Sequence, residues 1–289
     1  MNRALVILAV VLLLIAGVLA YVERATVRDW WQATTRPSLP AAKPFTPTIT
    51  PAPVQIPGPP TVVEGGIATS SHYTLESSPT TAPPVIVKKI DPFLDAGSLP
   101  DQANIDVPFT TQSPYATWTP QDEESCEEAS ILMVDAYYRG VQAITKDDAV
   151  KSLNAIVAYE MKAFGYFKDT SATTTAALVK GFYGYPDVRI VPYNVDQMKR
   201  AVVNGYPVIL PTAGKLLNNP NFHNGGPPYH MVVVKGYMSD GTIVTNDPGT
   251  RNGKDYLYSQ ATLDAAVHDW NNGDVTHGAQ LMIIVLPKT

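Results

Sequence analysis

The chain has 289 residues, of which 16% are charged, and its formal net charge is -5. Without an excess of Lys and Arg it cannot neutralise many phosphates, which excludes a basic nucleic-acid-binding protein. Its single cysteine excludes an intramolecular disulfide framework and a cysteine-rich zinc site.

The N-terminal segment is strongly apolar. The 19 residues from Ala4 to Val22 carry no charge, and Arg3 precedes them. A helix of that length reaches about 28 Å, close to the hydrocarbon thickness of a bilayer. We therefore expect residues 1–24 to form a transmembrane anchor with a cytoplasmic N-terminus. The alternative is a cleaved signal peptide and a secreted protein; either way the rest of the chain would lie outside the cytoplasm.

Residues 25–103 are predicted to be a linker. Between Pro37 and Pro100 the chain carries 14 of its 26 prolines. Proline cannot donate backbone hydrogen bonds and favours extended geometry, and large side chains are too sparse here to offset the entropy of ordering. We expect a semi-rigid spacer without fixed tertiary packing. A short strand at residues 85–87 that docks on the following domain is the alternative.

Residues 104–289 have the pattern of one α+β domain. Apolar residues recur with helical periodicity in the first part of the domain and at every second position in the later part. This order favours an antiparallel sheet over a βαβ repeat. The expected helices are 125–139, one starting at 145, 175–183, 195–204 and 259–270. The expected strands are 188–191, 206–211, 229–237, 242–246 and 280–286.

Local signals mark two of these elements. Ser125 and Glu128 match a capping box at the start of the first helix, and Gly140 is expected to end it. The tripeptide Ser239-Asp240-Gly241 forms a turn that joins strands 229–237 and 242–246 into a β-hairpin.

Cys126 lies in the first turn of the predicted helix 125–139, where unpaired N–H groups and the helix dipole favour a thiolate. A lone cysteine in an exported chain is a candidate nucleophile; the alternative is a small buried apolar side chain. Nearby acidic charges oppose thiolate formation unless an imidazolium compensates. We expect these acids to form a solvated helix start, or alternatively to select basic substrates. They are Asp122, Glu123, Glu124, Glu127 and Glu128.

His230 begins the most hydrophobic predicted strand, from which it can project into a cleft and deprotonate a thiol. Asp247 ends the partner strand, and antiparallel pairing returns it to the level of His230. Cys126, His230 and Asp247 in this order follow the logic of a papain-like triad. Taken singly, a buried core histidine and a turn-initiating aspartate are the alternatives.

Four ordered motifs strengthen this interpretation: Ile105 to Gln112 (IDVPFTTQ), Cys126 to Ser130 (CEEAS), Tyr229 to Tyr237 (YHMVVVKGY) and Asn246 to Gly249 (NDPG). Together they resemble the C39-like cysteine peptidases over residues 104–289. Many members of that family carry Cys-Gly where this chain has Cys126 followed by glutamate.

The resemblance implies a papain-like fold, with Cys126 as the nucleophile, His230 as the general base and Asp247 as the orienting acid. It also implies an oxyanion-stabilising glutamine upstream of the cysteine. The VPFxxQ motif points to Gln112, whereas spacing alone favours Gln121.

These observations predict an extracytoplasmic cysteine peptidase that hydrolyses peptide or amide bonds. Its expected partners are a peptide or protein substrate and, through the N-terminal helix, a membrane. We expect no nucleic acid, nucleotide, cofactor or metal, and neither GxxxxGK[ST] nor GxGxxG occurs in the sequence. The alternatives are a catalytically inactive peptide-binding or scaffold module of the same fold, and an acyl transferase in which an amine resolves the acyl-enzyme.

Overall fold

The computed structural model describes residues 13, 17, 34–46 and 98–288. The chain divides into two compact units, residues 1–39 and residues 40–289. Most of the predicted anchor lies outside the described residues, as do linker residues 47–97 with the alternative strand at 85–87. In the described part of the chain, no helix is both long enough and apolar enough to cross a membrane.

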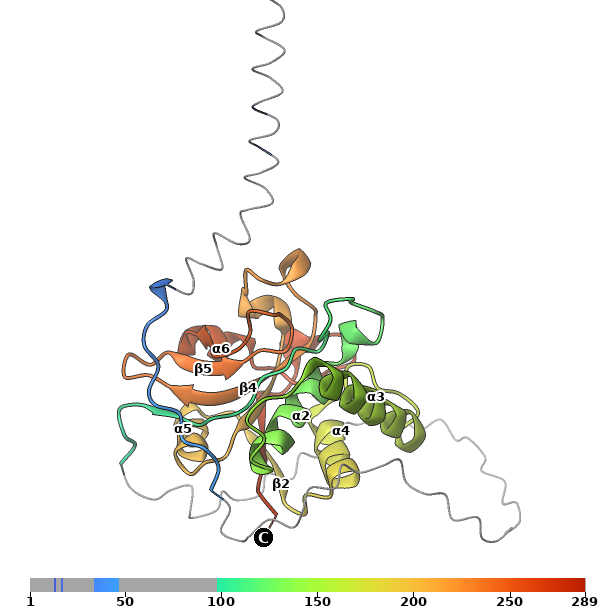
Figure 1. The fold of residues 1–289 in the computed structure, drawn as a ribbon, viewed down its shortest axis with the longest axis horizontal. Helices are drawn as coiled ribbons and strands as arrows, with labels where there is room; N and C mark the ends of the chain where they lie inside the picture. The colour runs from blue at the N-terminus through green and yellow to red at the C-terminus, as the bar shows by residue number, and fades with distance from the viewer. Residues whose placement is uncertain (1–12, 14–16, 18–33, 47–97, 289) are drawn as a thin grey trace, which may run out of the picture. The chain divides into compact units, whose positions relative to one another are not determined.

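A seven-stranded sheet forms the centre of the second unit (Figure 1). Its order is β2-β7-β3-β4-β5-β6, with β1 paired to β4, and all its strand pairs are antiparallel. The predicted α+β class with an antiparallel sheet is confirmed. The strands are β1 Ala103–Asn104, β2 Val188–Pro192, β3 Val208–Thr212, β4 His230–Tyr237, β5 Ile243–Asn246, β6 Tyr256–Tyr258 and β7 Leu281–Val285.

Helices pack against this sheet, and Figure 1 shows α2, α3 and α4 grouped together. Helix α2 contacts β4 and α3, α4 contacts β2 and β7, and α5 contacts β1, β3 and β4. The helices are α2 Cys126–Tyr138, α3 Lys146–Ala163, α4 Ala172–Leu178, α5 Val195–Val203 and α6 Gln260–Ala266, and a π-helical turn, Val179–Tyr183, follows α4.

Helix α2 is the central helix, and all of its residues are buried. Its apolar residues are spread around the helix rather than gathered on one face, which is typical of a helix enclosed on all sides. It ends at Tyr138, and Gly140 follows as the predicted stop, with a φ of +69° that glycine adopts without strain. The capping-box prediction was wrong: the Ser125 hydroxyl donates to the Gln121 carbonyl, and the Glu128 side chain points into the interior.

Two other predicted boundaries change for identifiable reasons. The helix expected at 175–183 begins at Ala172, because the Ser171 hydroxyl caps it by accepting from the Thr174 amide. The helix expected at 259–270 ends at Ala266, because Val267 turns to an extended conformation and bridges to Thr212 on β3. Strands β1 and β6 were not predicted.

Part of the predicted linker belongs to the second unit. The Lys43 amide donates to the Asn104 carbonyl at 3.0 Å, and the Asp106 amide donates to the Lys43 carbonyl at 2.8 Å. The Phe45 ring lies 5.5 Å and 5.1 Å from the rings of Tyr137 and Tyr138. The expectation of no fixed packing was therefore wrong for residues 40–46, where strand-like pairing and aromatic contacts order the chain.

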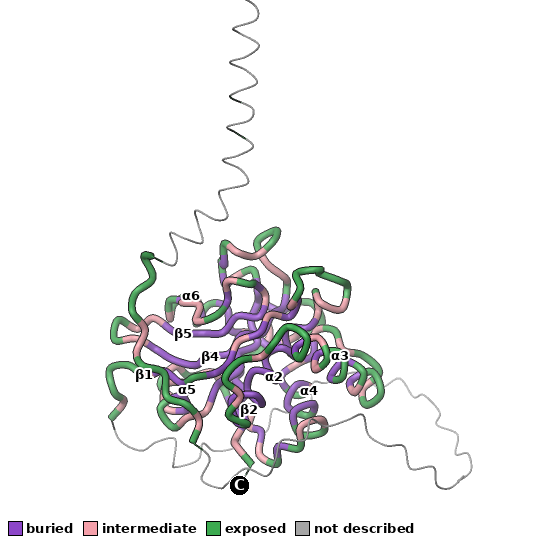
Figure 2. The backbone as a smooth tube through the Cα atoms, viewed as in Figure 1, coloured by how far each residue is buried: buried purple, intermediate pink, exposed green. Residues whose placement is uncertain are grey.

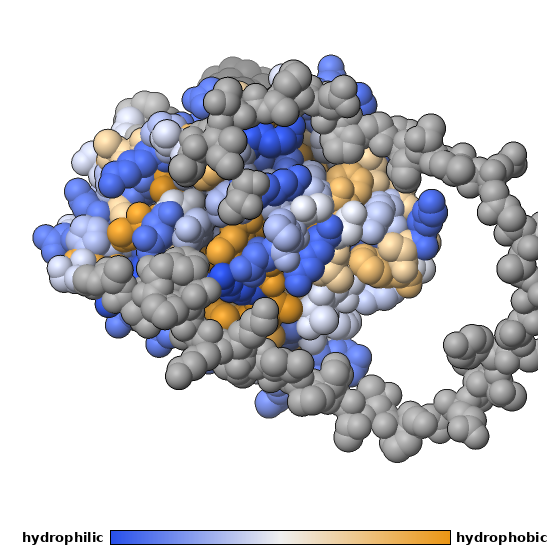
Figure 3. All heavy atoms as spheres, turned by 90° about the horizontal axis from the view of Figure 1, so that it is seen from below, coloured by the Kyte–Doolittle hydropathy of each residue, from blue (hydrophilic) through white to orange (hydrophobic). Residues whose placement is uncertain are grey.

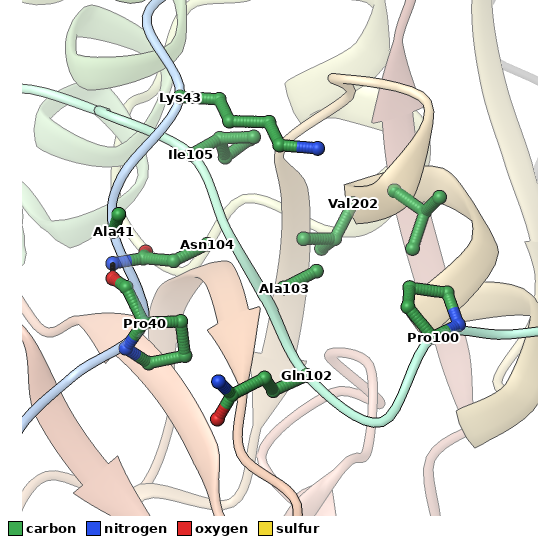
Figure 4. A pocket seen from close by; sticks show the side chains of 10 residues that line it. Pro40, Ala41, Lys43, Pro100, Gln102, Ala103, Asn104, Ile105 and Val202 are labelled. Atoms are coloured by element: carbon green, nitrogen blue, oxygen red, sulfur yellow. Dashed lines mark hydrogen bonds between the residues drawn. The ribbon is translucent and has the colours of Figure 1, made fainter.

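A crevice of about 160 Å³ lies beside this docked segment (Figure 4). Pro40 and Lys43 form one wall, Asn104 and Pro100 belong to another segment, and Val202 of α5 lies opposite. The predicted catalytic residues are not among those that line it.

The core lies between α2 and the middle of the sheet, where Figure 2 shows the buried residues concentrated. Strands β3, β4, β5 and β7 are buried along their whole length. On the face drawn in Figure 3, hydrophobic and hydrophilic side chains are interspersed. The ends of β4 and β5 that carry the predicted site residues are therefore anchored in the buried core of the domain.

Candidate active site

The hairpin of β4 and β5 brings two predicted site residues together. The register pairs Val233 with Asn246, so Asp247 leaves β5 close to the start of β4. There His230 Nε2 lies 2.8 Å from Asp247 Oδ1, and both side chains are buried. The predicted proximity of His230 and Asp247 is thus present in the fold.

Asp247 is held on both of its carboxylate oxygens. Besides His230, Oδ1 accepts from the Gly249 amide at 2.9 Å. Oδ2 accepts from the Tyr258 hydroxyl at 2.5 Å and from Asn219 Nδ2 at 3.0 Å. Burial raises the pKa of Asp247, but attraction to His230 and these hydrogen bonds outweigh it and hold the pKa below its ordinary value. Asp247 is therefore a carboxylate that accepts a hydrogen bond from the N–H of His230 Nε2.

The other ring nitrogen of His230 is left available. Among the described residues, Nδ1 has no hydrogen-bond partner although it is buried. The imidazole is fixed by close packing: the Phe222 ring lies edge-on with its centroid 5.2 Å away. A Cβ added at Gly249 would lie 2.9 Å from His230 Cε1. With Nε2 donating to Asp247, Nδ1 is the nitrogen that can accept a proton.

Cys126 is the first residue of α2 and is 5% exposed. Burial raises the pKa of its thiol well above the ordinary value, and the charge and hydrogen bond of Glu127 raise it further. The backbone amide of Met231 acts in the opposite direction and lowers it. Since Met231 follows His230, the sulfur lies at the start of the strand that carries His230.

The acidic residues before and after Cys126 are not all solvated. Glu127 and Glu128 are buried, so the prediction of a solvated helix start was wrong for these two. Glu127 accepts from Cys126 Sγ and from the Thr170 amide, each at 3.0 Å. The sequence could not predict their burial, because a residue pattern at a helix start does not reveal which segments pack over it.

Asp122 organises the loop between Gln112 and Cys126. Its Oδ2 accepts from Ser113 Oγ at 3.0 Å, from Thr117 Oγ1 at 2.9 Å and from the Thr119 amide at 3.0 Å. These contacts fix the chain immediately before the nucleophile candidate.

The two glutamine candidates are placed differently. Gln112 is buried, its backbone amide donates to the Pro248 carbonyl at 3.0 Å, and its Nε2 donates to the carbonyls of Asp122 and Glu123 at 2.8 Å and 3.1 Å. It therefore connects the turn after Asp247 with the loop before Cys126. Gln121 Nε2 instead donates to Asn154 Oδ1 on α3 at 2.7 Å.

Sequence reasoning assigned no role to four residues that surround His230 and Asp247, although Gly249 belongs to the NDPG motif. Tyr258 lies on β6, whose three residues are too few for a strand signal, and Gly249 lies in the turn after Asp247. Asn219 and Phe222 belong to the loop between β3 and β4, where Asn, Gly and Pro indicate a loop but not its contacts.

The described residues contain no group of three or more His, Cys, Asp or Glu side chains arranged to hold a metal ion. A cysteine at a helix start and a histidine bound to a carboxylate are the parts used by hydrolases with a thiol nucleophile.

The sequence profile of the Peptidase_C39 like family matches residues 104–273, more than half of the chain. The protein belongs to this family of cysteine peptidases. No curated protein matches the chain.

Several solved structures are similar at low sequence identity. A C39-like peptidase from Bacillus anthracis has 16% identity and a TM-score of 0.43, with 65% of this chain and 98% of that chain covered. A prointerpain A fragment from Prevotella intermedia has 14% identity and a TM-score of 0.42, with 71% and 77% covered. Xylellain, a cysteine protease from Xylella fastidiosa, has 11% identity and a TM-score of 0.33, with 70% and 91% covered. The family assignment rests on the profile match.

Proposed function

We propose that this protein is a papain-like cysteine peptidase that hydrolyses peptide or amide bonds through Cys126, His230 and Asp247. The observation that carries the proposal is the buried Nδ1 of His230, which has no hydrogen-bond partner in the described part of the chain, while Asp247 binds Nε2. With the proton of the imidazole on Nε2, the free Nδ1 can accept a proton from the nucleophile and return it to the leaving group.

The reaction that these residues can perform has two halves. The Cys126 thiol, which donates to Glu127 in this structure, turns to give its proton to His230 Nδ1, and the thiolate attacks the carbonyl carbon of the substrate. The tetrahedral oxyanion collapses as His230 returns the proton to the leaving amine, which leaves a thioester on Cys126. Water, deprotonated by His230, then hydrolyses the thioester and restores the thiol.

We assign the oxyanion role to Gln112 rather than to Gln121. Gln112 is buried between the turn that follows Asp247 and the loop that precedes Cys126, whereas Gln121 is bonded to α3. To donate to an oxyanion, Nε2 of Gln112 would exchange one of its two backbone carbonyl partners for the substrate oxygen.

The test is turnover of a fluorogenic peptide library by the purified protein. Cys126→Ser and His230→Ala should each lower kcat about a thousandfold or more without changing the melting temperature substantially. His277→Ala is the matched control, because His277 is an exposed histidine that pairs with Asp274. If both site variants retain the activity of the native protein, the peptidase mechanism is wrong. If the native protein binds peptides without cleaving them, the inactive binding module of the same fold is supported instead.

We further propose that catalysis takes place outside the cytoplasm, with residues 1–24 as a single-pass anchor. The support is the uncharged span from Ala4 to Val22 behind Arg3. Fractionation of cells that express the full chain should recover it with membranes, and protease added outside should reach the domain. Recovery of the uncleaved chain in the cytoplasmic fraction would refute this location.

A further inference from the structure

Glu127 occupies an unusual position beside the candidate nucleophile. Its side chain is 1% exposed and turns back toward the residue before it, so that Oε2 accepts from Cys126 Sγ at 3.0 Å. Oε1 accepts from the Thr170 amide, also at 3.0 Å, in the loop that precedes α4. Because both oxygens are engaged, the carboxyl group is fixed against the sulfur.

The groups that face Glu127 come from four elements and do not neutralise it. Glu128 lies on the same helix, Glu160 on α3, Asp169 in the loop before α4, and Tyr229 immediately before β4. Burial raises the pKa of Glu127 well above its ordinary value, and the charge of Glu128 raises it further. Its hydrogen bond with Cys126 acts in the opposite direction.

The basic residue of the neighbouring loop is engaged elsewhere. Lys168 Nζ lies 3.5 Å from Glu124 Oε1, and the Lys168 side chain is 57% exposed. A buried carboxyl group among other acids can hold a proton at pH values where an exposed glutamate cannot. Both protonation states of Glu127 are therefore relevant to the sulfur that it contacts.

We propose that Glu127 is a catalytic residue that determines where the proton of Cys126 resides, and that the activity of the enzyme declines as Glu127 ionises. This inference rests on the proposed peptidase function. As a carboxylate, Glu127 holds the thiol proton on sulfur, and a thiolate formed beside it would face a second negative charge. As a neutral acid, it donates its own proton in a hydrogen bond to the thiolate, while the thiol proton sits on His230 Nδ1.

Glu127→Gln imitates the neutral acid at every pH, because its amide can donate to the sulfur while its carbonyl accepts from the Thr170 amide. The readout is the rate of iodoacetamide alkylation across pH, followed by the mass of the intact protein. Since Cys126 is the only cysteine in the chain, every alkylated thiol is this one. We expect the midpoint of the profile to fall by about one pH unit or more. Alkylation should be about tenfold faster at pH values where Glu127 of the native protein is ionised and its thiol is still protonated.

Glu128→Gln is the matched control, since Glu128 is a neighbouring buried acid that acts on Cys126 by charge alone. It should shift the alkylation midpoint less than Glu127→Gln does. Glu127→Gly provides a second variant in case the glutamine destabilises the fold, and it should also lower the midpoint. If neither Glu127 variant lowers the midpoint beyond the Glu128→Gln control, Glu127 is only a structural side chain and the inference is wrong.

Turnover gives an independent measurement. Activity of the native protein should decline as Glu127 ionises, and Glu127→Gln should keep its activity to a higher pH. Absence of turnover in every variant would contradict the proposed peptidase function, while the alkylation profiles would still decide whether Glu127 controls the thiol proton.

Discussion

Two buried acidic regions flank the candidate nucleophile, and their polar groups are satisfied to different degrees. Around Asp247, both oxygens accept hydrogen bonds, from His230, Gly249, Tyr258 and Asn219. Around Glu128 and Glu160, the four carboxyl oxygens have no donor among the described residues, although both side chains are buried.

This difference in hydrogen bonding gives the two regions different properties. The Asp247 region is preorganised, because its network fixes one tautomer of His230 at little further cost. The Glu128–Glu160 pair can be buried together only if protons neutralise it, since two adjacent buried charges repel and lose their hydration. Burial raises the pKa of both carboxyl groups, and that of Glu160 reaches about 8.

Asp247→Asn should have the largest effect. Asparagine can keep the contact with His230 but can present its amide to Nε2, which would then become the acceptor and leave the proton on Nδ1. We expect kcat to fall by about 10²–10⁴-fold, a milder loss than that of His230→Ala. Steady-state kinetics at neutral pH check this, and an unchanged kcat would show that Asp247 does not orient His230.

Gly249→Ala should disturb the packing of His230 in the Asp247 region through steric overlap alone. The added Cβ would lie 2.8 Å from Phe222 Cε1 and 2.9 Å from His230 Cε1, so the imidazole has to move. Displacement by a few tenths of an ångström to 1 Å should lower kcat by about 10- to 100-fold. Kinetics and a melting curve are measured together; native kcat with a native melting temperature would refute the tight packing.

Glu160→Gln tests the Glu128–Glu160 region and should stabilise the protein at alkaline pH. With a folded pKa of about 8 and an unfolded value near 4.5, the native state binds a proton that the unfolded state lacks. The stability of the native protein therefore falls as pH rises from about 4.5 to 8. Glutamine cannot ionise, so above pH 8 the variant should be more stable by about 1–3 kcal/mol.

Urea unfolding at several pH values tests this linkage. Near pH 4 the variant and the native protein should differ little, because Glu160 is protonated in both states there. Glu123→Gln, which removes an exposed carboxylate, is the control. A stability difference that does not change between pH 4 and pH 8 would contradict the proposed titration.

Tyr258→Phe should have the smallest effect. It removes one of the two donors to Asp247 Oδ2, while Asn219 remains on the same oxygen. We expect a loss of about 1 kcal/mol in unfolding free energy and a decrease in kcat of less than about tenfold. Tyr256→Phe, on the same strand, is the matched control. A loss of activity as large as that of Asp247→Asn would mean that the network has no redundancy at Oδ2.

The sequence by itself determined the elements that carry the site. Consecutive apolar residues and Gly140 define α2, and the turn at Ser239 to Gly241 joins β4 and β5 into the hairpin that returns Asp247 to His230. These are local signals, because helix ends and hairpin turns depend on residues that are close in the chain. The one-residue register shift between Val234 and Gly236 had no signal in the sequence.

Only the tertiary structure decided the surroundings of these residues. The ordering of residues 40–46 against Asn104, the donation from Tyr258 and Asn219 to Asp247, and the enclosure of Glu127 beside Cys126 all join segments from different elements. From sequence alone, a glutamate at a helix start is predicted to be solvated. Whether it is buried depends on which loop and strand pack over it, and that is fixed by the whole domain rather than by its neighbours in the chain.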